Sequence, residues 1–171
     1  IKKENKIEKT ILKAINTLLE KNYQLSEYNI NKIHKKFHIE SEKLLPEKNY
    51  VGLSITQGNI YRRKEWPLEN IVKISNTLLS CNKTPVFFIE KKNIQLKNKI
   101  SKLIPRALFP EHNSELSCPA LVTCLGKRLD FAISIDNGVM HMLSLSKVPM
   151  ITLFGPTDSV KFAPEYKNLI V

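Results

Sequence analysis

The stretch FAISIDNGVMHMLSLSKVPMITLFGPTD, residues 131–158, decides the fold. It contains two apolar, strand-like runs, FAISI and PMITLF, with a segment of helical character between them. An Asp, an Asn, a Gly and a His follow the first run within six residues. Continuous apolar runs of this kind are typical of parallel strands that are covered on both faces. The stretch therefore predicts a strand, helix and strand unit with polar residues at the carboxyl end of its first strand.

The same alternation of strands and helices extends over the second two-thirds of the chain. Strands are predicted at residues 50–55, 85–89, 131–135, 149–154 and 168–171. Helices are predicted from Pro67, up to about Leu103, from a Ser117 cap to near Gly126, and up to about Ser146. A short extended piece is predicted around RALF, residues 106–109. This order predicts an α/β fold, a Rossmann-like doubly wound parallel sheet.

The chain of 171 residues, 42% of them hydrophobic, is long enough for one core. Residues 1–49 are predicted to be a helical connecting segment, and residues 50–171 the core domain. The chain has no initiator Met and ends in a strand-like run, so we expect it to be part of a larger polypeptide.

Several function classes lose support from what the sequence lacks. It has no apolar run of about 20 residues and no signal peptide, so neither a membrane crossing nor export is expected. The three cysteines have no CxxC spacing, and a reducing cytoplasm fits them best. P-loop, GxSxG, HExxH and GxGxxG motifs are absent. His34 and His38 have a metal-compatible spacing without a third ligand, so we predict no metal and no cofactor.

The net charge of +11 fits an anionic partner such as a nucleic acid, an acidic lipid or a phosphorylated small molecule. The lysines are dispersed over predicted helices and are not interleaved with aromatic residues. This pattern favours solvated helix faces over a nucleic-acid surface.

Residues 136–141, DNGVMH, lie where ligands bind in an open parallel sheet, beyond the carboxyl end of a strand. Gly138 would allow a tight turn and a close approach to a ligand, and the free amides of 138–141 would favour an anion such as phosphate. His141 can donate a hydrogen bond to that phosphate, and Asp136 can accept bonds from hydroxyls. The alternative is that Asp136 or Asn137 only caps the helix and that His141 is a half-buried histidine.

Two further loops should open on the same edge. Residues 155–158 follow the next strand and contain Gly, Thr and Asp. The loop 56–66 follows the first strand of the core domain and carries three cations that can reach a phosphate from the other side, Arg62, Arg63 and Lys64. The alternative is that Trp66 and Pro67 fix the start of the helix and that the cations are solvated.

These motifs resemble the donor-binding signature of glycosyltransferase family 9, the ADP-heptose:lipopolysaccharide heptosyltransferase family. SIDNGVMHMLSLSKVPMITLFGPTD is similar to that signature, and KEWP, residues 64–67, is similar to the family's Lys-x-Trp-Pro element. The two elements have the family's order and spacing over about residues 50–171.

The resemblance implies the C-terminal, donor-binding half of a GT-B glycosyltransferase, with the N-terminal acceptor domain absent. The implied donor is a nucleotide-sugar, typically ADP-heptose, and the implied acceptor is the lipopolysaccharide core, reached through the absent domain. Transfer would be inverting, with no metal and with a general base in that absent domain. The resemblance also implies a cytoplasmic location, with peripheral association to the inner membrane, and no nucleic acid as partner.

The family's roles carry over to seven residues of this chain. Lys64 would neutralise the donor diphosphate, and His141 would donate a hydrogen bond to it. The residues expected to hold the phosphate and sugar region are Asp136 and, through their amides, Asn137, Gly138 and Val139. Glu90, after strand 85–89, would contact the nucleotide ribose, although it comes early for that role.

The chain departs from the family in two further respects. Asn137 replaces the usual Thr or Ser and retains a side chain that both donates and accepts, which can change the donor preference. LSCPAL, residues 116–121, has no residue diagnostic of an adenine pocket. Two alternatives remain open: a different sugar on the same enzyme, and a non-catalytic Rossmann-like module that binds nucleic acid or other anions.

Overall fold

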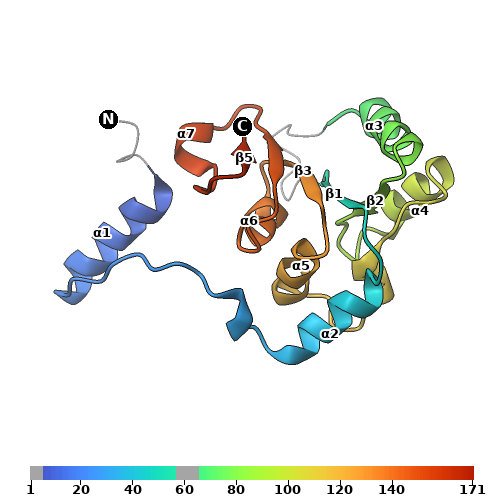
Figure 1. Ribbon diagram of the computed structural model, residues 1–171. Coiled ribbons are helices and arrows are strands. Elements are labelled where there is room, and N and C mark those ends of the chain that lie inside the picture. The colour runs from blue at the N-terminus through green and yellow to red at the C-terminus, as the bar shows by residue number, and fades with distance from the viewer. Residues whose placement is uncertain (1–5, 57–65) are drawn as a thin grey trace.

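The computed structural model describes residues 6–56 and 66–171 (Figure 1). Its strands form one parallel sheet in the order β2-β1-β3-β4-β5. Their bounds are β1 Tyr50–Ser54, β2 Thr84–Phe87, β3 Phe131–Ile135, β4 Met150–Leu153 and β5 Leu169–Ile170. The order reverses direction between β1 and β3, as in doubly wound folds. The predicted α/β Rossmann-like fold is confirmed.

Helices cover both faces of this sheet (Figure 1). On one face lie α3 (Leu68–Ser80) and α4 (Ile94–Leu103), and on the other lie α2 (Lys35–Leu44), α5 (Pro119–Gly126) and α6 (Gly138–Ser144). The other helical elements within the described ranges are α1 (Ile7–Leu19), η1 (Ile30–Lys32), η3 (Pro110–Asn113) and α7 (Ser159–Phe162).

Each face of the sheet has its own apolar core because successive side chains of a strand point to opposite faces. Along β1, Val51 and Leu53 pack with α3 and α4, whereas Tyr50 packs with α5 and α6. All five residues of β1 are buried. Burial on both faces explains why the sequence shows continuous apolar runs instead of an alternating pattern.

The predicted strands and helices agree with the structure to within a few residues, with local corrections. Pro67 is the N-cap of α3 and precedes its first turn. The Ser117 cap is wrong: the N-cap of α5 is Cys118, which makes no side-chain cap bond, and the Ser117 hydroxyl donates to Glu111 instead. The predicted extended piece is present, since Leu108 forms a parallel bridge with Val86 at the edge of β2.

The segment before β1 is attached to the sheet domain through α2. α2 packs on α5, and Leu45, which directly follows α2, is fully buried. The Arg128 guanidinium donates to the carbonyl oxygens of Leu45, Pro46 and Glu47. The division into residues 1–49 and 50–171 stays a prediction. No helix in the described part of the chain has the length and apolar character needed to span a membrane.

Candidate functional site

The point where the strand order reverses lies between β1 and β3. Ligands of open α/β sheets bind at such a point, outside the carboxyl ends of the strands, because the loops there diverge and leave a crevice. Asp136 and Asn137 directly follow β3, and Ile55 and Thr56 directly follow β1. The 136–141 corner predicted from sequence therefore lies at the reversal point of the sheet.

Asp136 is nine-tenths buried and is held by the loop that follows β4. The Thr157 hydroxyl donates to its Oδ2 atom, and the Asp136 amide donates to the Leu153 carbonyl at 3.1 Å. The predicted neighbourhood of residues 155–158 and the corner is thus confirmed. A carboxylate fixed in this way points in one direction before any ligand arrives.

Asn137 caps α6, as the alternative interpretation of the corner proposed. Its Oδ1 accepts from the Met140 amide at 3.0 Å, so one of the four amides over 138–141 is already satisfied. Its Nδ2 donates to Ser54 Oγ and to the Thr56 carbonyl, both at 2.8 Å. The side chain therefore joins the end of β3 to the end of β1.

Gly138 does not have the role in chain folding that the sequence suggested. No glycine in the described part of the chain has a positive φ, so the turn does not require one. An added Cβ at Gly138 would meet only Met142 Cε, at 3.9 Å, which is ordinary contact. The tight-turn explanation is wrong, and the close approach of a ligand to an exposed backbone remains as a reason for glycine here.

His141 is exposed on α6 and lines a groove of about 440 Å³. Glu8 of α1 and Tyr28 also line this groove. Partial desolvation by the surrounding protein lowers the pKa of His141, and the negative charges of Asp136 and Glu8 act against this shift. His141 and Asp136 thus lie close enough for their charges to interact, as the predicted shared site requires.

Lys64, Arg62 and Arg63 lie outside the described residues. The two ends of their loop are described: Thr56, which is bonded to Asn137, and Trp66, which packs against the core on the α3 and α4 face. The prediction that Lys64 faces a diphosphate stays a prediction.

Glu90 lies at the same edge but beyond β1, because it follows β2. It is exposed and forms an ion pair with Lys92 at 2.5 Å. The negative charge of Glu90 also contributes to a raised pKa of Glu111. The structure thus separates Glu90 from the 136–141 corner by the width of one strand.

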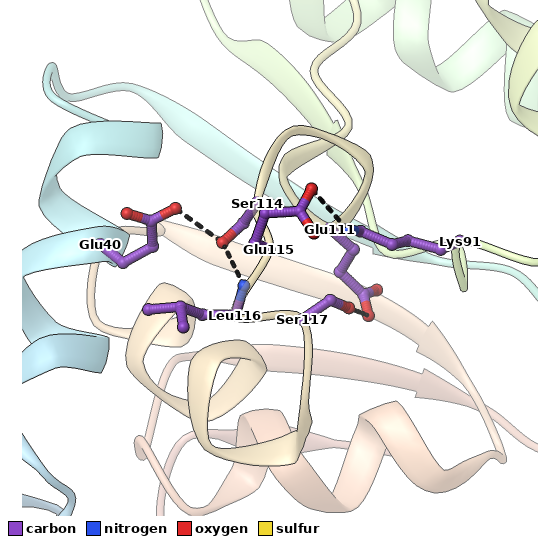
Figure 2. Close-up of polar contacts among 7 residues, drawn as sticks. All are labelled: Glu40, Lys91, Glu111, Ser114, Glu115, Leu116 and Ser117. Carbon is purple, nitrogen blue, oxygen red and sulfur yellow. Dashed lines mark hydrogen bonds and ion pairs between the residues drawn. The ribbon is translucent and has the colours of Figure 1, made fainter.

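Glu111 belongs to the polar loop that follows Leu108, drawn in Figure 2. The Ser117 hydroxyl donates to its Oε2 at 3.3 Å, while Oε1 is buried with no hydrogen-bond partner among the described residues (Figure 2). Burial is the main cause of the raised pKa of this carboxyl. In the same loop, Ser114 donates to Glu40 of α2 at 2.6 Å, and Lys91 pairs with Glu115 at 3.5 Å (Figure 2).

Thr157 belongs to the loop 155–158 that the sequence analysis placed at this edge. Two other polar residues of the edge, Ser54 and Glu111, were not singled out, because neither carries a sequence signal. A Ser at the end of an apolar run is common. Glu111 lies in a polar stretch where an exposed Glu is the ordinary expectation.

No group of three or more His, Cys, Asp and Glu side chains in residues 6–56 and 66–171 has a metal-binding arrangement. Among the described residues, the groups that the site offers to a ligand are a fixed carboxylate, an exposed glycine backbone and a histidine. These groups can bind hydroxyls and an anionic group side by side.

One family model matches almost the whole chain. The model of glycosyltransferase family 9 (heptosyltransferase) matches residues 2–171. The crystal structure of a family 9 glycosyltransferase from Veillonella parvula matches with a TM-score of 0.69 at 16% identity, covering 81% of this chain and 41% of that one. No curated protein matches the sequence.

Two E. coli structures show the same fold. The ADP-heptose lps heptosyltransferase II matches with a TM-score of 0.64 at 16% identity, over 81% of this chain and 43% of that chain. The heptosyltransferase WaaC with ADP-2-deoxy-2-fluoro heptose matches with a TM-score of 0.64 at 18% identity, over 96% of this chain and 48% of that chain. The chain thus spans less than half the length of these structures.

Proposed function

Because the chain belongs to glycosyltransferase family 9, we propose that it provides the donor-binding half of a heptosyltransferase. The complete enzyme would transfer a heptose, or a related sugar, from a nucleotide-sugar to a lipopolysaccharide core acceptor. ADP-heptose is the proposed donor, because two of the similar structures are described with ADP and with an ADP-heptose analogue. The acceptor would be held by a further domain, which would also provide the general base.

The observation that carries this proposal is the corner at the reversal point of the sheet. The buried Asp136 carboxylate, the exposed Gly138 backbone and His141 lie together there. A diphosphate linked to a sugar offers both an anionic group and hydroxyls, so it matches the acceptors and donors of this corner.

The proposed chemistry is stabilisation of the leaving group. As the glycosidic bond breaks, the departing ADP gains negative charge. Donors fixed at that position bind the transition state more strongly than the ground state, which lowers the barrier. Lys64 and His141 would be these donors, and inversion would follow from attack by the acceptor on the opposite side of the sugar carbon.

The experiment that tests this proposal is a calorimetric titration of the chain with ADP, UDP and GDP at two salt concentrations. We expect ADP to bind selectively, and Lys64→Ala to weaken ADP binding roughly tenfold or more, since a charge-assisted contact contributes about 1.5–3 kcal/mol. Lys127→Ala is the matched control, because Lys127 follows α5 and its ammonium group donates to Asn31, outside the 136–141 corner. Equal affinity in the wild type and in both variants would contradict the role of Lys64.

The second candidate function, a nucleic-acid-binding module, is favoured only by the net charge of +11. A module of that kind would bind RNA or DNA with an affinity that falls steeply with salt, because binding releases counterions from the phosphate backbone. It would be indifferent to ADP. Adding a single-stranded RNA to the same titrations separates the two functions.

A further inference from the structure

Four hydrogen bonds involve the Asn137 side chain, and its Oδ1 atom accepts the weakest of them from the Ser134 hydroxyl at 3.5 Å. The other three connect two loops of the sheet edge. One bond goes to the Met140 amide within its own turn, and two go to Ser54 and Thr56 on the neighbouring strand end. Residues 54 and 137 are separated by 83 positions in the chain. A single side chain thus bridges the point where the strand order reverses.

The orientation of this amide follows from its partners. The Thr56 carbonyl can only accept, so it must face the NH₂ group of the Asn137 amide. The Met140 backbone amide can only donate, so it must face Oδ1. The Ser54 hydroxyl accepts from the same amine while remaining fully buried. Since the three bonds occupy Oδ1 and both Nδ2 hydrogens, the side chain has no remaining donor for a nucleotide-sugar.

We propose that Asn137 is a positioning residue, which ties the end of β1, at Ser54 and Thr56, to the turn after β3 and so holds the 136–141 corner of the donor site in one geometry. This role differs from direct contact between the Asn137 side chain and the donor, and its effect on binding rests on the proposed function.

The buried neighbours of this bridge support the assignment. Ser54 and Ser134 are register partners on β1 and β3, and both are fully buried. The Ser134 hydroxyl donates to the Ile135 carbonyl at 2.8 Å. Polar groups in so dry a position are costly unless they are bonded, so the bridge has a defined geometry rather than exchanging with water.

The decisive variant is Asn137→Ser, which separates the cap from the bridge. Serine caps a helix as well as asparagine does, so the bond to the Met140 amide is retained. Its one hydroxyl cannot also donate to both Ser54 and Thr56. Asn29→Ser is the matched control, because Asn29 caps η1 through the same kind of bond, to the Asn31 amide, and this cap involves none of the residues of the bridge.

Two readouts are measured on each variant: the ¹⁵N order parameters of Thr56 and Met140, and the affinity for ADP. In Asn137→Ser we expect the Thr56 order parameter to fall from a rigid value of about 0.85 to below ~0.6 while that of Met140 is retained. We expect ADP affinity to fall by roughly fivefold or more, because a segment that is less ordered in the free protein must lose more conformational entropy when ADP binds. Asn29→Ser should change neither quantity.

Each departure from this pattern has its own meaning. An unchanged Thr56 order parameter overturns the bridge, and a lowered one with unchanged ADP affinity overturns its role in binding. If wild type binds no nucleotide, the proposed function fails while the relaxation data still decide the bridge. If the Met140 order parameter also falls in Asn137→Ser, Ser54→Ala replaces that variant. Ser54→Ala removes one acceptor of the bridge and leaves the Asn137 cap intact, so it should lower the order parameter of Thr56 and not that of Met140.

Discussion

Gly138 begins α6 with an exposed backbone and with open space where a Cβ would stand. Gly138→Ala should therefore not reduce the free energy of unfolding, and can raise it by up to ~1 kcal/mol, because alanine is the better helix former. The same methyl group would hinder a ligand that approaches this backbone, so ADP affinity should fall by about tenfold. Denaturant titration and calorimetry measure the two effects. Lower stability together with unchanged affinity would assign Gly138 to folding.

His141 gives the site a dependence on pH whose sign can be worked out. Desolvation lowers its pKa below the ordinary 6.5, so the free protein holds it neutral at pH 7 to 8. A bound diphosphate would favour the imidazolium and raise this pKa, so ADP binding would take up a proton and strengthen as pH falls. We expect the ratio of wild-type affinity to His141→Gln affinity to be several-fold higher at pH 6 than at pH 8. The titration of ADP itself cancels in this ratio, and a ratio independent of pH would remove His141 from the phosphate.

Glu111 is a buried carboxyl that should weaken the fold at neutral pH. Burial raises its pKa above the ordinary 4.5, so the folded state binds its proton more tightly than the unfolded state does. The stabilisation of the folded state by this tighter proton binding is complete below pH 4.5 and is lost as the pH rises through the folded-state pKa of Glu111. Glu111→Gln, which mimics the protonated acid, should therefore raise the unfolding temperature by ~2–4 °C at pH 8, for about 1 kcal/mol.

The control for Glu111 is Glu115→Gln in the same loop. Glu115 is almost fully exposed and pairs with Lys91 at the surface, so its change should have little effect on stability. The gain from Glu111→Gln should shrink at pH 4. Equal gains from both variants would indicate a general charge effect rather than relief of a buried carboxylate.

At the scale of elements, the contact between α5 and α6 depends on Gly126. A Cβ on this residue would stand 2.2 Å from Ser146 Oγ and 2.9 Å from Ser146 Cβ, so the two helices would have to move apart. Gly126→Ala should lower the free energy of unfolding by about 1–3 kcal/mol, as overpacking of a core does. Gly155→Ala is the control, because nothing lies within 4 Å of a Cβ there. Thermal unfolding measures both, and similar unfolding temperatures would show that α6 adjusts freely.

The elements themselves were largely predictable from the sequence, because strands buried on both faces and helices at regular spacing leave strong periodic signals. The weakest predictions concerned short-range competition for hydrogen bonds. Ser117 was expected to cap α5, yet its hydroxyl donates a hydrogen bond to Glu111, a residue that becomes its neighbour only when the loop folds. Asn137 was predicted as a site residue, and that stays a prediction; its bonds to the end of β1 depend on strand order, which no local pattern encodes.

At the scale of the whole molecule, the folded unit extends beyond the sheet domain on its amino-terminal side. None of the residues of α1 is buried. The polar links of this region to the rest of the chain include a half-buried bond from Lys6 to the Ala163 carbonyl and an exposed ion pair between Glu27 and Lys147. An exposed ion pair contributes little to stability. Leu45, in contrast, is fully buried among residues of α5 and α6.

Two truncations test where the cooperative unit begins. A chain that starts at Asn29 should unfold within about 3 °C of the complete chain, because none of the residues of α1 that it loses is buried. A chain that starts at Pro46 loses α2 and the Leu45 side chain, whose burial alone is worth about 2–5 kcal/mol, so its unfolding temperature should drop by 10 °C or more, at ~2–4 °C per kcal/mol. Calorimetric scans of the three chains compare them directly. A stable, cooperative chain from Pro46 would place the boundary near residue 50, whereas a large fall in unfolding temperature for the chain from Asn29 would make α1 part of the core. We expect neither outcome. The contacts of Arg128 with residues 45–47 fix the end of α2 next to the end of α5, and they do not reach α1.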